Sequence, residues 1–115
     1  MNNGYLTTHI LDIGIGKPAS NVQIELFDDD GQLIEKAKTN RDGRTNTPLL
    51  SEKAFKTGKY VLIFSVKDYL KQMHKLVEEP FYEHIKIEFF ISDKNEHYHV
   101  PLLLSPYGYS TYRGS

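Results

Sequence analysis

Two histidines separated by one residue are the first candidates for chemistry in this sequence. His97 and His99 fall in a segment over 97–104 that alternates in polarity, so both side chains project from one face of the predicted strand. His9 takes an outward position in a similar segment over 5–12. Because the reference pKa of histidine is about 6.5, these residues can act as general base or general acid near neutral pH.

Arg44 is a further candidate, since it directly follows a tight turn over 40–43. Its guanidinium stays charged and offers a planar fork of donors, which suits a substrate anion or a developing oxyanion. An arginine after such a turn is, however, often simply solvated. The spacing alone leaves both interpretations open.

The histidines also allow a metal site. The chain has no cysteine, so zinc would need His9 as a third ligand beside His97 and His99. His-x-His pairs are common without metal, and we therefore predict no metal ligands and leave the role of His97 open. His74 and His84 are interpreted as structural or exposed.

The segments that must position these residues are mostly short strands. Alternation or β-branched and aromatic content, bounded by Gly, Pro, Asp and Asn, predicts strands over 5–12, 22–27, 32–39, 60–66, 85–91, 97–104 and 109–113. Helical spacing appears only over 68–76. We therefore expect an all-β protein, an antiparallel β-sandwich of seven or eight strands with one short helix, as a single domain over 1–115.

Composition excludes several classes of function. The 115 residues include 14 basic and 15 acidic side chains, a formal net charge of -1. The sequence therefore has no excess of positive charge for binding nucleic acid or an anionic membrane. The absence of cysteine excludes disulfides and thiol nucleophiles. No apolar stretch approaches the ~20 residues of a membrane span. The first residues lack a basic and an apolar signal region, so we expect a cytoplasmic protein.

The outward faces carry more than histidines. Pro101 and Leu103 share the outward side of the 97–104 strand with His99, and apolar residues there suggest a surface covered by another subunit. The last seven residues are rich in hydroxyl and aromatic groups and follow a strand without a linker. These features predict an oligomer with an ordered C-terminus near a shared cleft.

Four separated motifs carry a family resemblance. They are LTTHILD at 6–12, GKPA at 16–19, NRDGR at 40–44, and the ending HYHVPLLLSPYGYSTYRGS at 97–115. In this order they resemble the transthyretin-like family, and the YRGS ending resembles its purine-catabolic branch, which hydrolyses 5-hydroxyisourate. The resemblance covers essentially the whole chain.

The resemblance implies a function that the spacing alone does not reach. It implies hydrolysis of 5-hydroxyisourate to 2-oxo-4-hydroxy-4-carboxy-5-ureidoimidazoline in urate catabolism, with no metal or organic cofactor. It also implies a homotetramer, a dimer of dimers with the active sites in a central channel. Its catalytic residues are then His9, Arg44, His99 and Ser115, with substrate binding by His9, Arg44 and Tyr112 and with Arg113 supporting the tail.

A carrier without catalysis is the alternative within the same family. In the hormone carriers of this family a lysine stands where this chain has His9, a glutamate where it has Arg44, and a threonine where it has His99. The carriers also lack the YRGS ending. Because this chain has the hydrolase residue at each position, the resemblance favours the enzyme.

Overall fold

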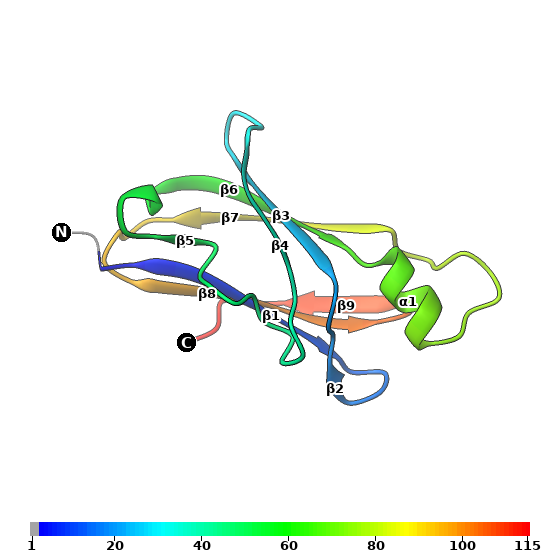
Figure 1. Ribbon diagram of the computed structural model, residues 1–115. Coiled ribbons are helices and arrows are strands. Elements are labelled where there is room, and N and C mark those ends of the chain that lie inside the picture. The colour runs from blue at the N-terminus through cyan, green and yellow to red at the C-terminus, as the bar shows by residue number, and fades with distance from the viewer. Residues whose placement is uncertain (1–2) are drawn as a thin grey trace.

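Two β-sheets packed face to face form the body of the protein (Figure 1). The computed structural model describes residues 3–115. Met1 and Asn2 lie outside the described residues. They belong to the predicted domain and to the N-terminal stretch in which we expect no signal peptide. The first sheet has the order β2-β1-β8-β9, with β5 also paired to β1, and the second has the order β4-β3-β6-β7.

The elements of the two sheets are bounded as follows. The first sheet contains β1 (Tyr5–Asp12), β2 (Lys17–Pro18), β5 (Leu50–Ser51), β8 (His97–Ser105) and β9 (Gly108–Thr111). The second contains β3 (Gln23–Asp28), β4 (Leu33–Lys38), β6 (Gly58–Ser65) and β7 (His84–Ile91). A 3-10 turn, η1 (Glu52–Ala54), precedes β6, and α1 (Lys67–Met73) follows it at one end of the sandwich.

The predicted sandwich is confirmed, with two departures. Residues 3–115 form nine strands instead of seven or eight, because the two-residue strands β2 and β5 are too short to show an alternating pattern. The second departure lies at the centre of the first sheet. In the described part of the chain every strand pair is antiparallel except β1 and β8, which run parallel over eight residue pairs. These two strands lie at opposite ends of the chain, so no hairpin turn constrains their relative direction. The parallel register sets Thr7 opposite His99 and His9 opposite Pro101.

The core follows from the alternation of the strands. In β1 and β8 the even-numbered residues face the second sheet, and Leu6, Ile10, Leu102 and Leu104 are completely buried. The helix is shorter than predicted, because it ends at Met73 and Lys75 takes a positive φ of 52°. Only Tyr69 and Leu70 of this helix are buried.

Pro101 corrects one expectation from the sequence. We expected a partner subunit to cover it, but Pro101 is already buried within this chain. Pro101 lies opposite His9 in the pairing of β1 with β8, and the Thr111 hydroxyl donates to the Pro101 carbonyl at 2.8 Å. Leu103 on the same side remains partly exposed.

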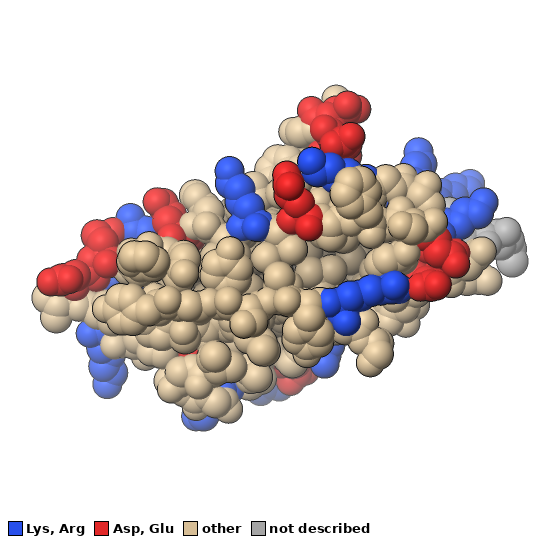
Figure 2. All heavy atoms as spheres, turned by 180° about the vertical axis from the view of Figure 1, so that it is seen from behind, with Lys and Arg blue, Asp and Glu red and all other residues tan. Residues whose placement is uncertain are grey.

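Charged side chains of both signs are spread over the surface. The face in Figure 2 shows basic and acidic groups side by side, together with a broad uncharged area and no continuous basic patch. Among residues 3–115, no helix has the length and apolar character needed to cross a membrane.

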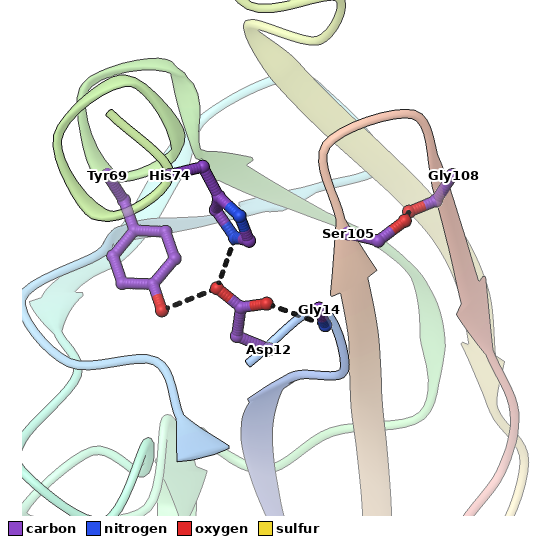
Figure 3. Close-up of polar contacts among 6 residues, drawn as sticks. All are labelled: Asp12, Gly14, Tyr69, His74, Ser105 and Gly108. Carbon is purple, nitrogen blue, oxygen red and sulfur yellow. Dashed lines mark hydrogen bonds and ion pairs between the residues drawn. The ribbon is translucent and has the colours of Figure 1, made fainter. Parts of the chain in front are cut away.

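A buried carboxylate joins the end of β1 to α1 (Figure 3). Asp12 is completely buried, and its Oδ2 accepts a hydrogen bond from the Tyr69 hydroxyl at 2.8 Å and contacts His74 Nε2 at 2.8 Å. Its Oδ1 accepts from the Gly14 main-chain N–H at 2.9 Å. His74 is therefore a structural residue, which is one of the two roles that the sequence allowed. The sequence did not indicate that its partner is Asp12.

We predict that Tyr69→Phe destabilises the fold. Burial and the bond to Asp12 raise the pKa of Tyr69, so its hydroxyl remains a donor at neutral pH. Removing it leaves a buried carboxylate short of one donor, which costs about 1.5–3 kcal/mol in the free energy of unfolding. Denaturant unfolding measures this, with Tyr107→Phe at a position 75% exposed as the control. Equal stability of the two variants would contradict the prediction.

Candidate active site

A polar cleft opens at the N-terminal ends of the parallel pair β1 and β8. Its volume is about 300 Å³, at the small end of the range for ligand sites. Thr7 lines it from β1, and His97 and His99 line it from β8. Arg44 and Ser115, which are distant in sequence, complete the wall together with the segment 45–48.

The turn that carries Arg44 is held against β1 by main-chain contacts. The Ile10 N–H donates to the Gly43 carbonyl at 2.8 Å, and Arg44 forms an isolated bridge with His9. Gly43 has a positive φ of 74°, and a Cβ there would lie 2.4 Å from the Ile10 carbonyl oxygen, so only glycine fits. Asn40 braces the same turn by accepting from the Arg44 N–H at 3.2 Å.

The C-terminal tail packs directly on His99. The Gly114 N–H donates to the His99 carbonyl at 2.8 Å, and a Cβ on Gly114 would lie 2.6 Å from Cδ2 of the His99 ring. Arg113 holds the tail from the other side: it donates to Glu96 at 2.5 Å, and its guanidinium lies 4.1 Å from the ring centre of Tyr98. The expected supporting role of Arg113 agrees with these contacts.

The Thr7 hydroxyl lies between the two histidines of β8. It is 2.7 Å from His97 Nε2 and 2.8 Å from His99 Nδ1. The His97 ring is also stacked on Tyr5, with 4.1 Å between ring centres and an interplanar angle of 11°. Each imidazole is therefore held in one orientation before any substrate enters.

The electrostatic environment keeps these imidazoles neutral. Burial lowers the pKa of His99, and the positive charge of Arg44 lowers it further, as do His97 and His9 when they are protonated. Burial and then Arg44 lower the pKa of His9, against smaller opposing effects of Asp42. Burial and Arg113 lower the pKa of His97. At pH 7 each ring thus has an unprotonated nitrogen that can accept a proton.

This arrangement suits acid–base chemistry on a polar, anionic or oxyanion-forming ligand. A neutral imidazole can take a proton from water, and the permanently charged guanidinium of Arg44, an exposed residue, can stabilise negative charge on oxygen. Within residues 3–115, no three His, Asp or Glu side chains are grouped as a metal site would require. His97 and His99 are bridged by a hydroxyl instead.

The predicted site residues do not all line this cleft. Arg44, His99 and Ser115 line it, and His9 lies beside it, with its ring against Gly43. Tyr112 lines a separate, more apolar hollow of about 430 Å³ beside Phe90 and is 56% exposed. We expected its hydroxyl near Arg44, but the two residues line different hollows of this subunit, and the substrate-binding role of Tyr112 stays a prediction.

Sequence reasoning missed two participants. Thr7 shares an outward face with His9, but nothing local indicates that it meets residues 90 and 92 positions away. The segment 45–48, which lines the cleft, follows Arg44 without any motif of its own. The register of β1 on β8 brings Thr7 to the histidines, whereas the segment 45–48 is placed by the Arg44–His9 bridge before it and by the pairing of β5 with β1 after it.

Comparison with known proteins places this chain among close relatives. The family model described as HIUase/Transthyretin family matches residues 6–114. The 5-hydroxyisourate hydrolase 2 of Rhizobium meliloti is 48% identical, over 98% of this chain and 98% of that protein. The solved 5-hydroxyisourate hydrolase of Klebsiella pneumoniae is 33% identical over 97% of this chain and 99% of that one, with a TM-score of 0.83. Sea bream transthyretin in complex with thyroxine is 30% identical over 95% of this chain and 93% of that one, also with a TM-score of 0.83.

We predict that Arg44→Gln raises the pKa of His99 and of His9 toward about 6.5, because the variant removes a positive charge that disfavours their protonation. As the pH falls, His99 and His9 of the variant therefore become protonated at a higher pH than they do in the natural chain. NMR titration of the imidazole protons measures both values. Arg41→Gln in the same turn is the control, and identical titration curves for the Arg44→Gln variant and the natural chain would refute the assignment.

Proposed function

This chain belongs to the HIUase/Transthyretin family, and we propose that it is a hydrolase of 5-hydroxyisourate. The observation that carries the proposal is a neutral His99 beside the fixed charge of Arg44 in one small polar cleft. Relatives at 48% and 33% identity, each matched over nearly its whole length, have this activity in their names.

The proposed reaction needs three actions from the protein. Water attacks a carbonyl carbon of the six-membered ring while a neutral imidazole, His99 or His9, takes one of its protons. The Arg44 guanidinium stabilises the oxyanion that forms. The ring C–N bond then breaks, and the protonated imidazole returns a proton to the leaving nitrogen. Ser115, at the edge of the same cleft, is proposed to orient the water or a histidine.

The fold by itself does not separate a hydrolase from a carrier. Sea bream transthyretin and the Klebsiella hydrolase match this chain with the same TM-score of 0.83. The site residues separate them, because a carrier has no need for a pair of neutral histidines that share a cleft with an arginine. These residues support the enzyme over the carrier.

We also infer that the active form is a homotetramer. Among residues 3–115, strands β7 and β9 each end a sheet and have no partner strand on one side, and the Phe90 side chain on β7 is 66% exposed. Such edges are suited to pairing with a second copy. Leu103, partly exposed on the side of β8 that carries His97 and His99, supports a second contact between faces.

We predict that the protein accelerates the decay of 5-hydroxyisourate, the intermediate that urate oxidase forms from urate. His99→Ala should lower turnover by about 10²–10⁴-fold, the usual loss for a positioned acid–base group. Absorbance spectroscopy follows the decay, with a chelator in a parallel sample and His84→Ala, at an exposed position on β7, as the matched control. Binding of the intermediate without faster decay would favour the carrier and overturn the hydrolase.

We predict that Leu103→Asp splits the assembly and removes activity. A buried charge without a partner at the contact between faces costs several kcal/mol. Analytical ultracentrifugation and turnover, measured on the same samples, test this, and Leu33→Asp on an exposed position of β4 is the control. A Leu103→Asp protein that is fully active as a dimer or monomer would contradict the proposed tetramer.

A further inference from the structure

A threonine hydroxyl that connects two histidines is the feature that the proposed reaction leaves unexplained. Thr7 Oγ1 contacts His97 Nε2 at 2.7 Å and His99 Nδ1 at 2.8 Å. Both distances are short for hydrogen bonds between an oxygen and a nitrogen. All three residues line the same cleft, so this connection ends at the candidate active site.

Hydrogen-bond accounting couples the protonation of the two rings. A hydroxyl has one proton to donate and two lone pairs that accept. When both imidazoles are neutral and the Thr7 proton stays in this network, one ring must donate to Thr7 and the other must accept from it. The position of one proton therefore determines which nitrogen of each ring is protonated.

The main chain favours one of the two directions. The Thr7 main chain raises the pKa of His99, against the stronger effects that lower it, as a backbone acceptor near the ring does. An acceptor at Thr7 attracts a ring N–H, and Nδ1 is the nitrogen of His99 that faces Thr7. His97, stacked on Tyr5, is then held in place as the acceptor of the Thr7 proton.

We propose that Thr7 and His97 are positioning residues that fix the tautomer of His99. The Nδ1–H of His99 donates to the Thr7 hydroxyl, and that hydroxyl donates to Nε2 of His97. The other nitrogen of His99, Nε2, is thereby left unprotonated to take the proton of the attacking water. This inference rests on the proposed hydrolase function and gives His97 a role that is not metal binding.

The test uses two substitutions at one position. Thr7→Val keeps the shape and β-branching of the side chain but removes the hydroxyl, whereas Thr7→Ser keeps the hydroxyl. Thr7→Val keeps the Thr7 main chain but removes the hydroxyl, so we expect the His99 proton to redistribute in part toward Nε2. We expect kcat to fall by about 10–100-fold, the scale found when the partner that orients a metal-binding histidine is lost. KM should stay unchanged. Thr7→Ser should restore the natural tautomer and rate.

Imidazole nitrogen chemical shifts in NMR report the tautomer without any substrate. His97→Ala should act in the same direction as Thr7→Val, because it frees the Thr7 proton to turn toward His99. Thr57→Val, at an exposed position before β6, is the control and should change neither reading. A Thr7→Val protein that keeps Nδ1–H on His99 with the natural kcat would overturn the inference.

The two proposals fail in different ways. A natural chain that does not accelerate the decay of the intermediate overturns the hydrolase, whatever the tautomer of His99. A natural chain that is active but carries the His99 proton on Nε2 overturns only the role assigned to Thr7 and His97.

Discussion

The parallel pairing of β1 with β8 is the constraint on which the rest of the candidate site depends. It sets Thr7 opposite His99 and aligns the outward faces of two strands that lie at opposite ends of the chain. A shift of one residue would turn every side chain of one strand to the other face, placing the histidines in the core and Leu102 in the cleft. The completely buried residues on the inner face, Leu6, Ile10, Leu102 and Leu104, make that shift costly. The hydrophobic core and the polar cleft are therefore two sides of one register.

Both ends of this pair are fastened by polar contacts. At one end of β1 the buried Asp12 carboxylate is held by Tyr69, His74 and the Gly14 main chain, which ties the strand to α1. Near the start of β8 the tail bonds to His99 through Gly114. A buried carboxylate is tolerated only with such donors, since an unpaired one costs several kcal/mol. These contacts oppose a change in the register of β1 on β8, the two strands that carry most of the site residues.

The chemistry of the cleft comes from placing a permanent cation beside partly buried imidazoles. Burial and Arg44 both disfavour protonation of His99 and His9, so the rings remain neutral where an isolated histidine would begin to titrate. The same guanidinium is available to an oxygen that becomes negative. One charge therefore serves two purposes, and the turn that presents it depends on Gly43, because a side chain there would strike the Ile10 carbonyl.

The sequence alone determined the sandwich, the inward faces of its strands and the outward position of His9, His97 and His99, because alternation is a local pattern that burial enforces within each strand. Its motifs also indicated the family and the candidate residues. Only the tertiary structure decided that β1 and β8 run parallel, that Thr7 lies between His97 and His99, that Pro101 is covered within the chain, and that Tyr112 faces a separate hollow. These features depend on which distant segments pair and in which direction. No local period carries that information, because contacts between residues 90 or more positions apart are set by the packing of the whole fold.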